Sequence, residues 1–335
     1  MRLLIWGAGA IGGTIAGYLI RAGHDVTLVD TAADHVAALN DSGLSITGPI
    51  DEFTVAATAF TPENVPGQYE TILLCVKSQH TTNAARALKP HLADDGYVVS
   101  VQNGHNEATI AGIVGEARTM GAFVNFGADY IAPGTIMFGG RGAVVLGEID
   151  GQRTPHIEAL HKALLDFDEN AIITDNIFGY LWGKTAYGAI LFATALTNES
   201  IADCLDDPDY RDLYIAIAQE ALRVARAKGI TPEAFNGFNP HAFAPGVDPA
   251  VSQQSLDEMV AFNRQSAKSH SGIWRDIAVR KRPTEVVIME PVVTEGRAHG
   301  VSTPLTQRII ALIRELERGE REQSMENLAL LKAML

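Results

Sequence analysis

The first thirty residues carry the pattern that most restricts what this chain can fold into. A short apolar run at 2–6 is followed by a G-x-G-x-x-G segment that extends from Gly7 to Gly12. Apolar residues then recur at helical spacing over 11–22, and the alternating, β-branched run 24–30 follows directly. A buried strand, a helix and a second strand in this order predict a βαβ unit, and therefore a parallel sheet.

The glycines of this turn suit a loop that holds a dinucleotide. One glycine permits the tight strand-to-helix turn, one lets the backbone approach a pyrophosphate, and one lets the helix pack closely on the strand. The unpaired N–H groups at the start of the helix attract the phosphates. We therefore predict that Gly7, Gly9, Ala10, Ile11 and Gly12 bind a dinucleotide cofactor, with a purely structural glycine turn as the alternative.

Asp30 bears on the identity of that dinucleotide. It ends the second strand, 18 residues after Gly12, where a carboxylate accepts hydrogen bonds from both ribose hydroxyls of NAD. The same charge repels a 2′-phosphate, and the following residues TAADH include no arginine or lysine to compensate. The sequence favours NAD(H) over NADP(H). Asp30 also suits the cap of the segment that follows it, and both roles can hold together.

The remainder of the chain divides into two parts of different character. Up to about residue 175, strand-like runs alternate with helical ones, which predicts an α/β domain; from 177 onward helical periodicity dominates. We predict a Rossmann-type dinucleotide-binding domain at 1–175 and a helical substrate and catalytic domain at 176–335. The strands are expected at 52–60, 71–78, 97–103, 120–126 and, as a pair around a glycine turn, 135–147. Helices are expected at 80–92, 177–196, 209–229, 255–269, 283–300 and 304–323.

Composition narrows the class of protein. The net charge of −14 argues against a nucleic-acid partner, which would require a basic stripe. The two cysteines form neither a disulfide framework nor zinc-ligand spacing, so we expect no metal. The glycines interrupt the first apolar segment, unlike a signal peptide, and no apolar stretch has membrane-spanning length. A soluble cytoplasmic protein without a membrane partner is the simplest expectation.

Four later segments, in the same order along the chain, resemble the ketopantoate reductases, also called 2-dehydropantoate 2-reductases: LLCVKSQHT, VQNGHNE, LWGKTAYGAI and SGIWRDIAVRKRPTE. The resemblance implies a Rossmann domain followed by an all-helical domain of the 6-phosphogluconate dehydrogenase C-terminal type, with the active site in the cleft between them. It implies reduction of a small 2-oxo acid with a nicotinamide hydride, and it leaves NADP(H) possible. A homodimer is expected from the fold type alone.

The resemblance also assigns roles to individual residues. Lys77 matches the lysine near the cofactor, and Asn103 matches the asparagine beside the nicotinamide and substrate. Lys184 matches the proposed proton donor, and Glu285 matches the carboxylate that contacts the substrate. Ser271 falls close to the family's substrate serine. Lys184, Glu285 and Asn103 are therefore the predicted catalytic residues.

The predicted substrate site departs from the family pattern. The family has asparagines four and eight positions after its lysine, where this chain has Gly188 and Phe192. Both lie on the helix face of Lys184, because residues four and eight apart share a face. We expect Gly188, Phe192, Asn198 and Ser271 to line the substrate site, and the two departures make the substrate less certain than the reaction type.

Three residues, Glu285, Pro291 and Lys184, also have structural interpretations. Glu285 is expected on a helix that starts at Pro283, where a carboxylate also suits the helix dipole. A structural role is therefore an alternative to a functional one, in which Glu285 accepts a hydrogen bond from a substrate hydroxyl or pairs with Lys184. Pro291 is expected to kink that helix. Lys184 can supply a proton and stabilise a developing alkoxide, or it can be a lysine whose stem covers apolar surface.

Three functions are compatible with these features. The leading one is an NAD(P)-dependent reductase of the ketopantoate reductase type. The second is a related enzyme that acts on another branched or hydroxylated 2-oxo acid, which the residues at 188 and 192 favour. The third is a dinucleotide-binding sensor without turnover, against which the retained Lys184, Asn103 and Glu285 argue.

Overall fold

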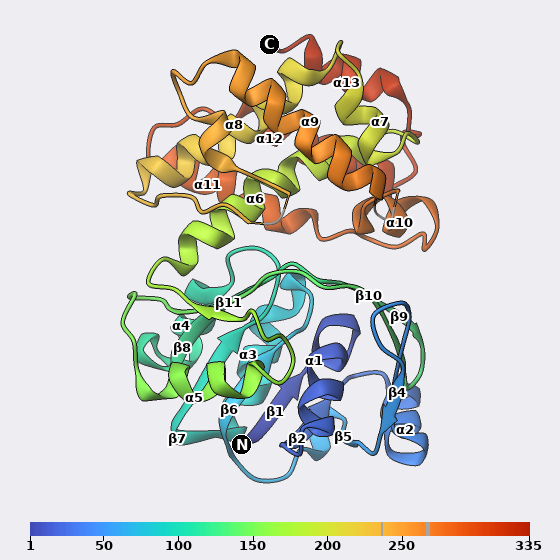
Figure 1. The fold of residues 1–335 in the computed structure, drawn as a ribbon, viewed down its shortest axis with the longest axis vertical. Coiled ribbons are helices and arrows are strands. Elements are labelled where there is room, and N and C mark those ends of the chain that lie inside the picture. The colour runs from blue at the N-terminus through green and yellow to red at the C-terminus, as the bar shows by residue number, and fades with distance from the viewer. Residues whose placement is uncertain (236, 266–268) are drawn as a thin grey trace. The chain divides into compact units, whose positions relative to one another are not determined.

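The computed structural model describes residues 1–235, 237–265 and 269–335. They form two compact units, Met1–Ile177 and Phe178–Leu335, and the division lies two residues from the predicted boundary. Figure 1 shows a mixed helix-and-strand architecture in the first unit and helices in the second. Each unit buries its own apolar core.

A sheet of eight strands organises the first unit. Its order is β12-β11-β8-β7-β6-β1-β2-β5, and all neighbours are parallel except the antiparallel pair β8 and β11. The chain leaves β1 first for β2 on one side and later for β6 on the other, so the strand order reverses at β1. The strands are β1 (Arg2–Trp6), β2 (Asp25–Val29), β5 (Thr58–Phe60), β6 (Tyr69–Leu74), β7 (Leu92–Ser100), β8 (Thr119–Val124), β11 (Val144–Glu148) and β12 (Ile172–Ile173).

Apolar side chains on both faces of this sheet explain its three layers. On β1, Leu3 and Ile5 join one buried cluster, and Leu4 and Trp6 join another, because successive side chains of a strand point to opposite faces. The first cluster includes residues of three helices: α1 (Ala10–Arg21), α2 (Ala33–Ser42) and α5 (Pro155–Leu164). The second cluster includes residues of α3 (Thr81–Leu88) and α4 (Glu107–Val114).

A second, four-stranded sheet shows that two of the strand predictions are wrong. Its order is β4-β3-β10-β9, with β3 (Leu44–Thr47), β4 (Phe53–Val55), β9 (Gly127–Ala132) and β10 (Thr135–Gly140). The single strand predicted at 52–60 is wrong, because the chain passes from β4 in this sheet to β5 in the large one. The pair predicted within 135–147 is also wrong. There β10 pairs with β9 and β3, whereas β11 pairs with β8 and β12, so the glycine-rich turn carries the chain between sheets.

Helices make up the second unit, which confirms the predicted fold class. Its apolar core contains residues from every long helix, and its described residues include no strand beyond the isolated bridge Phe235–Phe238. The helices are α6 (Ile177–Thr194), which begins at the end of the first unit, α7 (Ile201–Asp206), α8 (Arg211–Ala227), α9 (Pro249–Gln265), α10 (Gly272–Ala278), α11 (Glu290–Ala298), α12 (Pro304–Glu317) and α13 (Met325–Lys332). Short 3-10 turns are η1 (Pro62–Asn64), η2 (Ser78–His80), η3 (Lys89–His91), η4 (Glu116–Arg118), η5 (Pro240–Phe243) and η6 (Val286–Met289).

The helix predicted from Pro283 is wrong in its start. Glu285 stands at the N-cap position of the 3-10 turn η6, and α11 begins only at Glu290. Pro291 lies in the first turn of α11, where a residue without an N–H group leaves no intrahelical hydrogen bond unmade. The proline therefore begins a helix and does not kink one.

Candidate functional site

The glycine turn after β1 has the three properties that a dinucleotide requires. Gly7 has a φ of +105°, and a Cβ there would lie 2.9 Å from the Cys75 carbonyl carbon. A Cβ on Gly12 would lie 2.1 Å from the Gly7 oxygen, so only glycine allows α1 to pack this closely. The Cβ position of Gly9 faces open space, with no atom within 4 Å. The turn is thus tight, closely packed and open on one side, which fits a bound pyrophosphate at the start of α1.

The Asp30 side chain makes hydrogen bonds to this turn and to the residue that precedes the next helix. Its Oδ2 accepts a hydrogen bond from the Ala8 N–H (3.0 Å), and its Oδ1 accepts one from the N–H of Ala32 (3.0 Å), the N-cap residue of α2. Asp30 thus bonds the residue before α2, but within the described residues the N-cap position of that helix has no side-chain cap hydrogen bond. Each carboxylate oxygen has two acceptor positions, so these bonds leave capacity for ribose hydroxyls.

Lys77 and Asn103 lie at the same edge of the sheet, three residues beyond the ends of β6 and β7. Strand register aligns Trp6 with Leu74 and Leu74 with Ser100, so the glycine turn and both loops leave neighbouring strands at one level. Ligands of open α/β sheets bind at this carboxyl edge, next to the point where the strand order reverses.

A polar network that the sequence analysis did not single out holds Asn103. The Asn103 carbonyl oxygen accepts hydrogen bonds from the Ser78 hydroxyl and from Asn106 Nδ2 (2.8 Å). Gln102 Nε2 donates to the Thr81 hydroxyl (2.8 Å), which donates to Asn106 Oδ1 (3.0 Å). Polar residues after two adjacent strands, in SQHT and QNGHN, were the signal that could have located this network.

In the helical unit, Lys184 and Glu285 form an electrostatic pair. Lys184 lies on α6 and is half-buried. Burial lowers the pKa of its ammonium group to about 8, and the negative charge of Glu285 offsets part of that fall. A lysine with this pKa remains largely protonated at neutral pH and gives up its proton far more readily than an exposed lysine.

The remaining predicted substrate residues of α6 have different surroundings. The Cβ position of Gly188 faces open space, with no atom within 4 Å. Phe192 is 1% exposed and packs in the core of the helical unit. On the face of α6 that carries Lys184, the position one turn further along (Gly188) is thus open. The position two turns further along (Phe192) is occupied by a core side chain. Ser271 is buried and caps α10, since its Oγ accepts the Trp274 N–H (3.2 Å).

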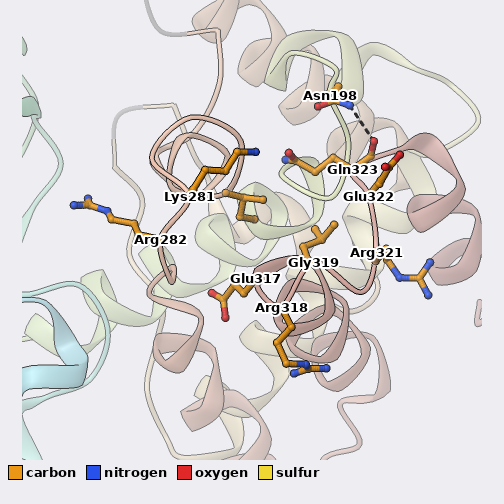
Figure 2. A pocket seen from close by; sticks show the side chains of 11 residues that line it. Asn198, Lys281, Arg282, Glu317, Arg318, Gly319, Arg321, Glu322 and Gln323 are labelled. Atoms are coloured by element: carbon orange, nitrogen blue, oxygen red, sulfur yellow. Dashed lines mark hydrogen bonds between the residues drawn. The ribbon is translucent and has the colours of Figure 1, made fainter.

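Asn198 lies at a separate hollow of the helical unit, of about 640 Å³ (Figure 2). Asn198 Nδ2 donates to the carbonyl oxygen of Gln323 (2.9 Å). Lys281 and Arg282 also line the hollow, whereas Lys184 and Glu285 do not. The structure therefore does not bring Asn198 into the group around Lys184.

The described residues show neither a metal-binding cluster nor a membrane-spanning helix. No group of three or more His, Cys, Asp or Glu side chains is arranged to hold a metal ion. Within the same residues, the helices are too short or too polar to cross a membrane.

Comparisons with known proteins agree along the whole chain. The family model described as ketopantoate reductase PanE/ApbA matches residues 3–151, and its C-terminal counterpart matches residues 176–317. A 2-dehydropantoate 2-reductase of Pyrococcus abyssi is 31% identical over 323 residues, which cover 96% of this chain and 99% of that protein.

Solved structures match equally widely. A PanE/ApbA family ketopantoate reductase from Ralstonia eutropha has a TM-score of 0.80 and 26% identity, covering 96% of this chain and 99% of its own. A D-mandelate dehydrogenase solved with NADH and anilino(oxo)acetate has a TM-score of 0.82 at 21% identity, covering 95% of this chain and 99% of its own. The latter likeness is one of fold.

Proposed function

Because the chain belongs to the ketopantoate reductase family, we propose that it reduces the carbonyl group of a small 2-oxo acid to a hydroxyl group with a nicotinamide dinucleotide. The family predicted from sequence is confirmed, and with it the assignment as an oxidoreductase. The dinucleotide is supported by the open, tightly packed turn at Gly7, Gly9 and Gly12. The related D-mandelate dehydrogenase was solved with NADH.

One observation carries the proposed chemistry. Lys184 combines a pKa of about 8 with the adjacent charge of Glu285, which suits a group that donates a proton near neutral pH. When bound, the reduced nicotinamide supplies a hydride to the carbonyl carbon. Lys184 donates its Nζ proton to the carbonyl oxygen, and its charge stabilises that oxygen as negative charge develops. Glu285 and Asn103 orient the substrate.

Lys184→Ala tests the assignment directly. We expect turnover to fall by at least about 100-fold, the usual contribution of a general acid, while NADH still binds. The measurement is the loss of NAD(P)H absorbance with a panel of 2-oxo acids, beside NADH titration by fluorescence. Full activity in the variant would contradict the role of Lys184.

The pH profile provides an independent check of the same lysine. Reduction requires protonated Lys184, so kcat/KM should fall as pH rises through about 8 in the wild-type enzyme. If the rate is flat from pH 7 to pH 10, another group donates the proton. If no 2-oxo acid oxidises either cofactor, the sensor alternative is favoured.

A second candidate differs only in substrate. The family's two asparagines are replaced by Gly188, which faces open space, and by Phe192, which lies in the core. Both changes remove polar groups that would hydrogen-bond a hydroxylated acid. The test is to compare kcat/KM for ketopantoate with kcat/KM for more apolar 2-oxo acids. A kcat/KM highest for ketopantoate would exclude this second candidate.

A further inference from the structure

The loop that leads to Glu285 is held at its start by a buried carboxylate. Asp276, 6% exposed, accepts hydrogen bonds from Arg280 Nη1 (3.0 Å) and Arg282 Nε (2.8 Å), and its carbonyl accepts the Arg282 N–H (3.0 Å). Between them Lys281 has a φ of +50°, a left-handed conformation that is costly for a residue with a side chain. Such a conformation persists where surrounding contacts hold it.

A second carboxylate holds the end of the loop. Glu317 Oε1 accepts both the N–H (2.7 Å) and the hydroxyl (2.7 Å) of Thr284, which immediately precedes Glu285. The Thr284 hydroxyl oxygen in turn accepts the N–H of Val286 (3.1 Å). Thr284 is 5% exposed, so these charge-assisted bonds are sheltered from water. Thr284 is thus bound directly to the Glu317 carboxylate, and Val286 is linked to it through the Thr284 hydroxyl.

Glu317 is the last residue of α12, and both ends of that helix are anchored. At its start, the buried Glu220 accepts the N–H groups of Leu305 (2.9 Å) and Thr306 (2.8 Å), an arrangement that the helix dipole favours. Toward its end, Arg314 pairs with Glu290 at the start of α11.

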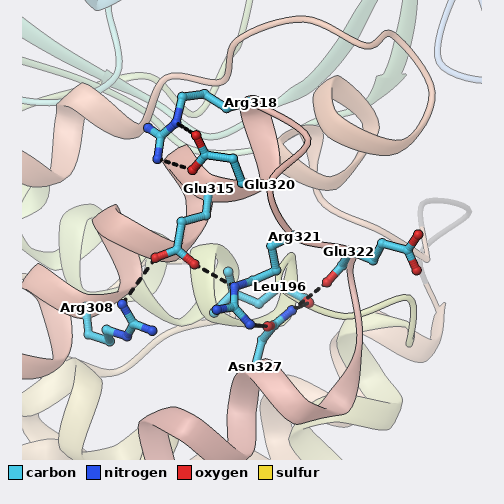
Figure 3. Close-up of polar contacts among 8 residues, drawn as sticks. All are labelled: Leu196, Arg308, Glu315, Arg318, Glu320, Arg321, Glu322 and Asn327. Carbon is cyan, nitrogen blue, oxygen red and sulfur yellow. Dashed lines mark hydrogen bonds and ion pairs between the residues drawn. The ribbon is translucent and has the colours of Figure 1, made fainter.

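A polar network fixes the chain on either side of Glu317 (Figure 3). Glu315 accepts hydrogen bonds from Arg308 (3.2 Å) and Arg321 (2.6 Å), and Arg321 also donates to Asn327 Oδ1 (3.1 Å). Asn327 Nδ2 donates to the Leu196 carbonyl oxygen beyond the end of α6 (2.9 Å). The carboxylate that holds Thr284 therefore projects from a fixed point.

We infer that Glu317 is a positioning residue: by holding Thr284 it fixes the backbone that presents Glu285 to Lys184. This inference rests on the proposed function, because it gives Glu285 a role at that site. Glu285 makes no side-chain cap to η6 in the described chain, and its carbonyl oxygen accepts the Ile288 N–H of that turn (3.0 Å), so the hold on Thr284 is a restraint that comes from outside the turn. The negative charge of Glu285 acts on Lys184, as its effect on the lysine pKa shows.

The protonation of Lys184 reports the position of Glu285 without requiring turnover. In full-length protein, acetylation of Lys184 by acetic anhydride is measured against pH by mass spectrometry. Glu285→Gln should lower the Lys184 pKa, because it removes the charge that raises it. We expect Glu317→Ala and Thr284→Val to lower it in the same direction. Glu322→Ala, an exposed carboxylate on the same hollow as Glu317 (Figure 2), should leave it unchanged.

Thr284→Ser separates positioning from general destabilisation. Serine retains the hydroxyl that Glu317 and Val286 engage, so it should restore the wild-type Lys184 pKa, whereas the isosteric Thr284→Val should not. In activity, Thr284→Val should reduce kcat/KM by up to about 100-fold, the cost of a misplacement of about 1 Å. Thr284→Ser and Thr284→Val together still test the inference if Glu317→Ala does not fold.

The outcomes distinguish this inference from the proposed function. If Glu285→Gln lowers the pKa of Lys184 and neither Glu317→Ala nor Thr284→Val does, Glu317 is not a positioning residue, although the proposed function stands. If these variants lower the pKa but Lys184→Ala keeps full activity, the positioning holds and the proton-donor role fails. An effect of Glu322→Ala equal to that of Glu317→Ala would also overturn the inference.

Discussion

Burial shifts the pKa values of two side chains, Lys184 and Glu107, in opposite directions. It lowers the pKa of Lys184 to about 8 and raises that of Glu107, the first residue of α4, to about 7. The cause is the same in both, because removal from water disfavours the charged form. Lys184 has a charged partner in Glu285, whereas both carboxylate oxygens of Glu107 lie buried without a hydrogen-bond partner among the described residues.

Glu107 should make stability depend on pH. Its pKa is higher in the folded protein than in the unfolded chain, so between about pH 4.5 and 7 the folded state binds more protons. Stability therefore falls as pH rises through this window, by roughly 3 kcal/mol in total from this group. Glu107→Gln should remove that fall, measured as the difference in urea unfolding free energy between pH 5 and pH 7.

Glu116→Gln is the matched control for this prediction. Glu116 lies in η4, nine residues further along the chain, and is exposed. The control should leave the pH dependence of the wild-type protein intact. Equal slopes in wild-type protein and Glu107→Gln would show that Glu107 does not titrate in this window.

Asp30 should govern the choice between cofactors. Its carboxylate already accepts the Ala8 and Ala32 N–H groups, and its charge disfavours a 2′-phosphate. Asp30→Asn retains an acceptor for one of these groups and removes the charge, so we expect the ratio of kcat/KM for NADH to that for NADPH to fall about tenfold. Asp34→Asn, a nearby exposed carboxylate, serves as control. An unchanged ratio in Asp30→Asn would contradict the ribose assignment.

At the scale of the element, two glycines of α6 have opposite surroundings. A Cβ on Gly183 would lie 2.5 Å from the Glu233 carbonyl oxygen, whereas one on Gly188 would meet nothing within 4 Å. Glu233 is held there by its N–H, which donates to the Gly179 oxygen (3.0 Å). One glycine is required by close packing, and the other leaves room beside Lys184.

Substitution by alanine should change the unfolding free energy in opposite directions at these two glycines. Gly188→Ala removes a helix-interior glycine without a clash and should raise the unfolding free energy by up to about 1 kcal/mol. Gly183→Ala should lower it by about 1–3 kcal/mol, because backbone must move to admit the methyl group. Thermal unfolding followed by circular dichroism measures both. A loss of stability in Gly188→Ala would contradict the open surroundings of that residue.

The elements themselves were predictable where a local pattern decides them. The glycine turn and the strands around α1 follow from residues adjacent in sequence, and so do the long amphipathic helices. The partners of β4, β5, β10 and β11 were not predictable, because alternation shows that a run is extended and not which sheet it joins. The start of the turn at Glu285 depends on Thr284 and Glu317, which lie 33 residues apart.

At the scale of the molecule, the two units have separate cores. The core clusters of the first unit end at Ala171, and the core cluster of the helical unit begins at Trp182. The cofactor turn lies wholly in the first unit, whereas Lys184 and Glu285 lie in the second. Cofactor binding should therefore mainly stabilise the first unit.

Calorimetry with NADH tests this division. At a cofactor concentration about 100 times its Kd, the transition that includes the first unit should gain about 2.7 kcal/mol. Asp30→Arg, which places a bulky cation at the ribose position, should lose most of that gain. A NADH-dependent rise that is unchanged in Asp30→Arg would place the cofactor elsewhere.

The sequence alone determined the dinucleotide turn, the helical second half, the family and the candidate residues, because each is encoded in short segments with fixed spacing. Only the tertiary structure decided which of those candidates share surroundings. It paired Glu285 with Lys184, buried Phe192 in a core and set Asn198 on a different hollow. The reason is physical: burial, pKa and hydrogen bonding are set by residues distant in sequence, which no local pattern specifies.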